Sequence, residues 1–111
     1  MTESEFMMLA EHTLSYIEAA LEKAADSTDL DIEWDRSGNL LEVEIISNAS
    51  KIIINTQAPM QQIWVAAKSG GFHYKHEAGK WIDTRDGSEL FAALSQMLSA
   101  QSGLPVHLQR E

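Results

Sequence analysis

The spacing of the apolar residues changes twice along this chain of 111 residues, and this change constrains the fold more than any other feature. Over residues 6–24 apolar side chains recur at steps of three and four, the period of one helix face. Over residues 30–83 short segments alternate apolar and polar side chains, the period of a half-buried strand. Over residues 90–98 the helical spacing returns. The pattern predicts one helix, a series of strands and a second helix.

Capping and breaking residues set the expected helix ends. Thr2 and Glu5 have the spacing of a capping box, so the first helix should begin there. It is expected to end near Ala25, before a segment of short polar side chains. Asp86, three residues before a glutamate, is expected to begin the second helix, which the Gly-Leu-Pro segment 103–105 should stop.

The strands between the helices predict the fold class. They are expected at residues 29–35, 41–45, 51–56, 62–66, 72–76 and 80–83, with turns at Ser37-Gly38-Asn39 and Gly70-Gly71. Because no helix separates them, the sheet should be antiparallel. Two apolar helix stripes and one apolar sheet face must bury one another. We therefore expect an α+β fold, a two-layer α/β sandwich whose N- and C-terminal helices pack on one face of a roughly six-stranded antiparallel sheet.

The chain has the length of a single domain, residues 1–111. In its C-terminal tail, residues 102–111, three apolar side chains alternate with other residues: Leu104, Val106 and Leu108. We expect these to pack along the groove between the two helices.

The whole net charge of −9 lies in the first third of the chain. Residues 1–35 carry ten carboxylates and one base, Lys23, whereas residues 36–111 carry equal numbers of acids and bases. Nucleic-acid binding needs positive charge, so this class of partner is excluded. No apolar run is long enough to span a membrane, and the acidic start is unlike a targeting segment, so we expect an intracellular protein. Cations and basic protein surfaces are the expected partners.

The chain contains no cysteine, which excludes disulfides, thiolate metal sites and a cysteine nucleophile. It also lacks the sequence signatures of a P-loop, a nucleophile elbow and a zinc protease. His73 and His76 lie three apart in an expected strand, so they should face opposite sides of the sheet and not chelate one ion together. No catalytic centre is expected.

Carboxylates of the first helix and the first strand are expected to form one surface, which we call the acidic ridge. Its helical members share one arc of the helix and its strand members share one face; they are Glu11, Glu18, Glu22 and Asp26, followed by Asp29, Asp31, Glu33 and Asp35. Carboxylate oxygens suit hard cations such as Ca²⁺, Mg²⁺, Mn²⁺ and iron. Neighbouring strand carboxylates repeat at about 7 Å, too far to ligate one ion together, so binding should be weak and exchangeable. A solvated face that only keeps the protein soluble is the alternative.

The segment Gln57–Trp64 is uncharged and carries an aromatic residue in an expected strand. If Ile63 and Val65 point into the core, Trp64 points to the outer sheet face, where a tryptophan among amides is typical of a protein contact. The opposite register would bury Trp64 instead. The residues alone leave both orientations open.

Several motifs resemble the frataxin family, specifically its bacterial branch. Lys51–Ala66, which reads KIIINTQAPMQQIWVA, is similar to the N-x-Q-x-P-x-x-Q-I-W core of that family. The segment GGFHY at 70–74, Trp81 and the Asp-Gly pair at 86–87 also fit, as does the opening Ser-Glu-Phe at 4–6. The resemblance covers residues 4–101 and implies a helix–sheet–helix sandwich.

The resemblance implies that the protein binds iron, as Fe²⁺ or Fe³⁺, and modulates iron–sulfur cluster assembly without being an enzyme. Binding would be weak and exchangeable, and other divalent cations would compete. The ridge positions that match the family's iron-binding region are Glu18, Glu22, Asp26, Asp29, Asp31 and Glu33. Ala19, Lys23 and Ala25 depart from the acidic pattern and thin the helical half of the ridge.

The resemblance also implies partners: a cysteine desulfurase and an iron–sulfur scaffold protein, in the bacterial cytoplasm. The matching partner-facing positions, which we call the amide–tryptophan surface, are Asn55, Gln57, Gln62 and Trp64. A monomer is expected, with iron-dependent oligomers as an alternative. Two other functions stay open: iron storage with ferroxidase activity, and protein docking with only incidental iron binding.

Overall fold

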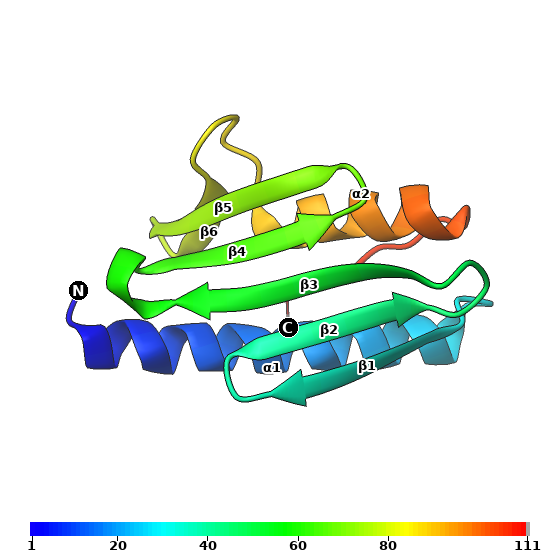
Figure 1. Ribbon diagram of the computed structural model, residues 1–111, viewed down its shortest axis with the longest axis horizontal. Coiled ribbons are helices and arrows are strands. Elements are labelled where there is room, and N and C mark those ends of the chain that lie inside the picture. The colour runs from blue at the N-terminus through cyan, green and yellow to red at the C-terminus, as the bar shows by residue number, and fades with distance from the viewer. Residues whose placement is uncertain (111) are drawn as a thin grey trace.

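The structure is a computed structural model that describes residues 1–110 (Figure 1). Its elements are α1 (Glu3–Ser27), β1 (Ile32–Ser37), β2 (Leu40–Ile45), β3 (Ser50–Gln57), the short 3₁₀ helix η1 (Ala58–Met60), β4 (Gln62–Ala67), β5 (Gly70–Glu77), β6 (Lys80–Asp83) and α2 (Leu90–Ser102). No helix of residues 1–110 is both long and apolar enough to cross a membrane.

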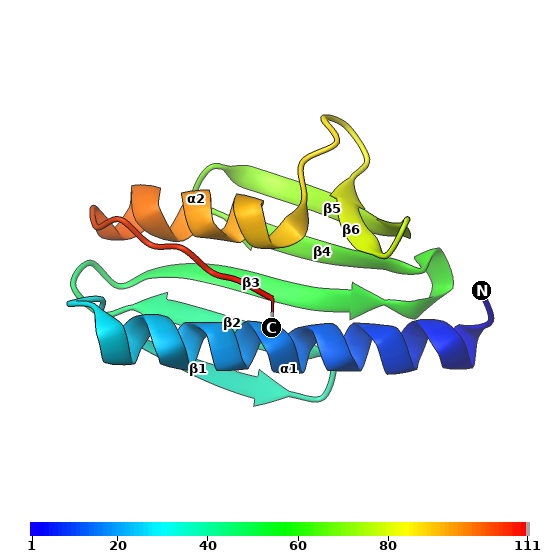
Figure 2. The ribbon, with the colours of Figure 1, turned by 180° about the vertical axis from the view of Figure 1, so that it is seen from behind.

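The six strands form one antiparallel sheet in the order of the chain, from β1 at one edge to β6 at the other. Figures 1 and 2 show both helices on the same side of this sheet, α1 behind β1 and β2 and α2 behind the opposite half. The expected two-layer sandwich is therefore confirmed. The outer sheet face has no covering layer among the described residues, so its side chains meet solvent.

The first helix begins as expected and ends two residues later than expected. At its start the Glu5 N–H donates to the Thr2 Oγ1, and the Thr2 N–H donates to the Glu5 carboxylate, which completes the capping box and lowers the Glu5 pKa. At its end the hydroxyls of Ser27 and Thr28 donate to the carbonyls of Lys23 and Ala24, at 2.8 and 2.7 Å. These bonds satisfy carbonyls of the last turn, so the helix continues past Ala25.

The first two strands form a tight hairpin. A two-residue turn joins them, and its first residue, Gly38, has a φ of 62°, a conformation that favours glycine. The expected turn is thus confirmed. The strand itself begins at Ile32 instead of residue 29, because only the Asp31 carbonyl, which accepts from the Ile46 N–H, continues the ladder beyond it.

Two expected boundaries are wrong. Gly70 and Gly71 do not form a turn: they open β5 and pair with the last two residues of β4, and the turn lies at residues 68–69. Asp86 does not begin α2, because its carboxylate accepts from the Ser88 N–H in the preceding loop, which lowers the Asp86 pKa. The cap is Glu89, whose side chain accepts from two N–H groups of the first turn.

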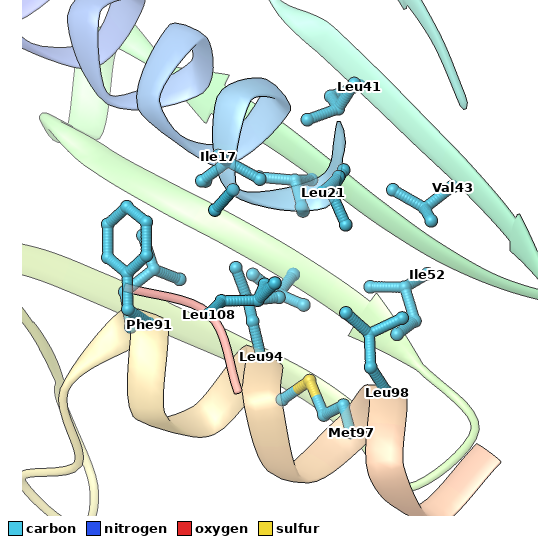
Figure 3. Close-up of a cluster of buried hydrophobic side chains, with 14 of the residues drawn as sticks. Ile17, Leu21, Leu41, Val43, Ile52, Phe91, Leu94, Met97, Leu98 and Leu108 are labelled. Carbon is cyan, nitrogen blue, oxygen red and sulfur yellow. The ribbon is translucent and has the colours of Figure 1, made fainter. Parts of the chain in front are cut away.

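The core lies between the helices and the inner sheet face. Figure 3 shows Ile17 and Leu21 of α1 and Leu94 and Leu98 of α2 directed toward the same apolar cluster as the inner side chains of β2 and β3. One buried hydrogen bond crosses this layer, from the Trp81 Nε1 to the Thr13 Oγ1, at 2.8 Å. This bond satisfies the polar atoms of two residues that lie among apolar neighbours.

The C-terminal tail fills the seam between the helices, as expected. Figure 2 shows it running back from α2 along the space between α1 and α2. Val106 and Leu108 are buried and Leu104 is partly buried. Two serines of α2 fasten the backbone: the Ser99 hydroxyl bonds to the N–H and carbonyl of Val106, and the Ser95 Oγ accepts from the Leu108 N–H at 2.8 Å.

Candidate functional site

The acidic ridge lies where the end of α1 meets the start of β1, at one corner of the molecule (Figure 1). In the strand half every carboxylate is exposed, and buried or half-buried apolar residues lie between them; the exposed members are Asp29, Asp31, Glu33 and Asp35. In the helical half Glu22 and Asp26 are exposed, whereas Glu18 is partly buried. Glu33 and Asp35 therefore face the outer side of the sheet, whereas Glu18 lies on the inner side, where Arg36 of β1 reaches it.

Arg36 of β1 neutralises part of the helical half, which the sequence analysis missed. Its guanidinium lies 3.4 Å from a Glu18 carboxylate oxygen and 3.7 Å from one of Glu11, and it also donates to the Ser15 hydroxyl. Arg36 has the same strand parity as Trp34, so it points toward α1. The alternation along β1 already showed in the sequence that Arg36 faces inward. The sequence did not show that α1 lies beside this part of the strand, so the ion pairs could not be predicted.

The ridge does not form a closed metal cage. Among residues 1–110 no three His, Asp or Glu side chains converge closely enough to hold one ion. A cation at this surface would therefore keep several water ligands and exchange readily.

The acidic surface extends across the outer face of the sheet onto β2, whose carboxylates were not among the expected ridge residues. In the β1–β2 register Glu33 lies opposite Glu44, and Asp35 lies opposite Glu42. These two carboxylate pairs, with Trp34 between them, line a shallow hollow of about 470 Å³. Cross-strand neighbours lie roughly 5 Å apart at Cβ, so their charges repel one another.

One base limits this repulsion. The Lys51 ammonium lies 2.9 Å from a Glu42 carboxylate oxygen, and this hydrogen bond raises the Lys51 pKa. Lys51 also lies opposite Glu44 in the β2–β3 register. The outer face of the first hairpin thus keeps an excess of negative charge beside the paired Lys51.

Trp64 lies on the outer sheet face, which resolves the orientation that the sequence left open. Ile63 and Val65 are buried against the helices, and Trp64 between them is half-buried. Its indole Nε1 donates to the Gln62 Oε1 at 2.8 Å. Its ring stacks on the His73 imidazole, with centroids 4.3 Å apart and planes 13° from parallel. The tryptophan is therefore held rigidly in one orientation.

The other amides of the amide–tryptophan surface lie beside Trp64. Asn55 is opposite Trp64 in the β3–β4 register, and Gln57 is opposite Gln62. All four side chains are partly exposed. Three strand spacings of about 4.8 Å separate β1 from β4, and the cross-strand row of Trp64 ends at Ser37 in β1, two residues from Asp35. Asp35 and Trp64 therefore lie roughly 16 Å apart on one face.

The two histidines of β5 do not converge. His73 stacks on the outer face, whereas the His76 ring contacts the buried Trp81 edge-on at 5.1 Å. The expectation that they face opposite sides of the sheet is confirmed. His73 instead has a structural role beside Trp64, which its sequence position alone did not indicate.

Comparison with known families and proteins identifies relatives of this chain. A family model described as a frataxin-like domain matches residues 1–104. The chain is 66% identical, over 109 residues, to the iron-sulfur cluster assembly protein CyaY of Janthinobacterium sp. (strain Marseille), covering 98% of this chain and 97% of that protein. It is 62% identical, with the same coverage, to the iron-sulfur cluster assembly protein CyaY of Herminiimonas arsenicoxydans.

Solved structures show the same fold. Frataxin from Psychromonas ingrahamii matches with a TM-score of 0.88 at 38% identity, over 98% of this chain and 99% of that one. Trimeric frataxin from the yeast Saccharomyces cerevisiae, complexed with ferrous, matches with a TM-score of 0.73 at 25% identity, over 86% of each chain.

Proposed function

The chain belongs to the frataxin family, and from that premise we propose that it binds iron and modulates iron–sulfur cluster assembly. The observation that carries the proposal is its 66% identity, over nearly its whole length, to a protein named for that role. Without any cysteine it cannot hold a cluster by its own thiolates, so it acts by binding and not as a cluster carrier. We expect this role in the bacterial cytoplasm, and the bacterial origin of the relatives supports that expectation.

Iron, as Fe²⁺ or Fe³⁺, binds the acidic ridge weakly through six carboxylates: Glu18, Glu22, Asp26, Asp29, Asp31 and Glu33. Hard carboxylate oxygens and the ferrous complex of the yeast relative support this ligand. The strand half is the stronger part, because Arg36 competes with a cation for Glu18. Other divalent cations compete for the same carboxylates.

The partners are a cysteine desulfurase and its scaffold protein. The acidic ridge steers the chain onto a basic partner surface, because attraction between opposite charges raises the rate of encounter. Trp64 and its amide neighbours then anchor the complex, since a rigid, half-exposed tryptophan is a typical interface hot spot. Bound iron tunes the docking by neutralising ridge carboxylates.

Charge reversal at the ridge tests the docking. Asp31→Lys should weaken binding to a desulfurase–scaffold complex by tenfold or more, as measured by isothermal titration calorimetry at physiological salt. Glu77→Lys is the matched control, because it makes the same charge change at an exposed site on β5, away from the ridge. Equal affinities for the two variants would refute docking through the ridge.

An anaerobic ferrous titration followed by two-dimensional amide NMR tests the iron site. Paramagnetic broadening should be confined to residues 18–33 and should disappear in an Asp29→Asn, Asp31→Asn double variant. Broadening spread evenly over all exposed carboxylates would contradict a ridge site.

Protein docking with only incidental iron binding is the second candidate, because no three carboxylates converge among residues 1–110. The two functions differ in one measurement. If desulfurase affinity is the same with and without ferrous iron, the chain is a docking module; if iron changes it, the iron-dependent role holds.

A further inference from the structure

The outer edge of β1 is an unpaired strand edge. β1 is the first strand in the sheet order and pairs only with β2. Figures 1 and 2 show no other segment beyond it on that side. An open edge offers a row of backbone donors and acceptors to an incoming chain.

The register shows which backbone groups of β1 are already used. The Ile46 N–H donates to the Asp31 carbonyl at 3.0 Å, so these two residues form a hydrogen-bonded pair. In an antiparallel ladder such pairs recur at every second residue. Glu33 and Asp35 therefore also bond to β2 through their backbones.

The alternate residues direct their backbones to the open side. The N–H and carbonyl groups of Ile32, Trp34 and Arg36 point away from β2, and no other backbone or side chain within residues 1–110 bonds to them. An added strand of five or six residues could form about six hydrogen bonds with these groups.

Negative charge lies on both sides of this edge. On the outer side Glu33 and Asp35 are exposed, with the carboxylates of β2 beyond them. On the inner side the ion pair from Arg36 to Glu18 shows that α1 runs beside the edge, and Glu22, one turn further along α1, is exposed. Trp34, on the same inner side as Arg36, adds a half-buried aromatic surface.

The negative charge beside the β1 edge determines which class of partner can bind there. A second copy of this chain would bring the same carboxylates against themselves, and like charges facing each other across strands are destabilising. A nucleic acid is repelled for the same reason. A basic extended peptide satisfies both the backbone groups and the carboxylates.

We propose that the β1 edge binds a basic, extended segment of an assembly partner by strand addition, with Lys or Arg at alternate positions facing Glu33 and Asp35. This inference rests on the proposed docking function and specifies its geometry. Main-chain hydrogen bonds hold the segment, and alternate side chains give specificity.

The test uses a defined probe, the peptide acetyl-Lys-Val-Lys-Val-Lys-Val-Lys-amide. Its matched control has the same sequence and charge but an N-methyl group in place of every backbone N–H, so it cannot form a ladder. The parent peptide should bind the full chain at least about tenfold more tightly than the methylated one, because only it can donate to the edge carbonyls. Equal binding by the two peptides would overturn strand addition.

Hydrogen exchange of individual amides locates the binding. On addition of the parent peptide the N–H groups of Ile32, Trp34 and Arg36 should become protected at least about tenfold, whereas those of Glu33 and Asp35, already bonded to β2, should change little. Protection that does not alternate along β1 would overturn the proposal. Glu33→Lys should weaken peptide binding and Glu77→Lys should not.

The same measurement separates this inference from the proposed function. In a complex with a cysteine desulfurase, alternating protection along β1 supports strand addition by the partner. If the desulfurase binds but β1 shows no protection, strand addition fails and the docking function stands. If the desulfurase does not bind at all while the basic peptide does, the docking function fails and the edge remains a peptide site.

Discussion

Replacing Leu108 tests whether the C-terminal tail is part of the core. Its side chain is 2% exposed and packs with Ile17, Leu21 and Leu94 from both helices. Leu108→Ala removes these contacts and leaves a cavity, which costs about 2–5 kcal/mol at buried leucines. Because the tail can shift toward the space, we expect the lower half of that range, about 2–3 kcal/mol. A domain of this size has roughly 5–15 kcal/mol of stability, so the loss is a large fraction of it.

The hydrogen bonds of the tail limit how far it can shift. The Leu108 N–H is held by Ser95, and the Val106 backbone is held at both its N–H and its carbonyl by Ser99. Ser95→Ala would leave the buried Leu108 N–H without its partner, at a cost of about 1–3 kcal/mol. The two changes share a contact, so their effects should not add.

Urea unfolding followed by far-ultraviolet circular dichroism measures these losses. Leu108→Ala should lower the unfolding midpoint with an unchanged m-value, and should lower Tm by roughly 8–15 °C. His107→Ala, at the exposed neighbouring position, is the control and should change the stability by less than about 0.5 kcal/mol. If Leu108→Ala behaves like His107→Ala, the tail does not contribute to the core and the reasoning is wrong.

Three further predictions concern charge. Burial, with nearby carboxylates, raises the pKa of the Tyr74 phenol above its ordinary value of 10.0, so the folded chain keeps a proton that the unfolded chain loses. Stability should therefore decline as the pH rises above about 10, and Tyr74→Phe should make that decline smaller in urea unfolding between about pH 8 and 11; an unchanged decline would contradict the reasoning. Raising sodium chloride from about 0.02 to 0.5 M shortens the Debye length from roughly 20 to 4 Å. Because this screens the repulsion between the carboxylates of the folded chain, the Tm should rise; an unchanged Tm would contradict repulsion within the acidic surface. Arg36→Gln removes the guanidinium that pairs with Glu11 and Glu18. It should therefore strengthen Mn²⁺ binding by about two- to fivefold in isothermal titration calorimetry, and weaker binding would contradict this reasoning.

The order of the helices and strands was predictable because the spacing of apolar residues depends only on the segment that carries it. The alternation at Leu41, Val43 and Ile45 requires no knowledge of the partner strand, and it marks β2 correctly. The wrong element boundaries fall at residue types that are common in two different local structures. Gly70 suits a turn but also the distorted start of a strand, with a φ of 136°, and Asp86 suits a helix cap but also the loop before it.

The candidate site was only partly predictable because much of it depends on register. The carboxylates of α1 and β1 are close in sequence, so the chain order predicted that the end of α1 and the start of β1 would lie at one corner of the molecule. Glu42 and Glu44 join that surface only because β2 pairs with β1 in a particular register. The orientation of Trp64 and its stack with His73 depend on register in the same way.

The facing carboxylates of the first hairpin have a consequence for evolution and engineering. Each like-charged pair, Glu33 with Glu44 and Asp35 with Glu42, destabilises the sheet by roughly 0.2–1 kcal/mol relative to a neutral pair. Substitutions that increase stability are therefore easy to find here, and Glu44→Thr is an example. Selection for thermostability alone would remove these acids early. Their presence in this hairpin marks a place where the chain keeps charge at the expense of stability, so a heat-resistant variant that must also keep its negative charge should be searched for in the core and not in this hairpin.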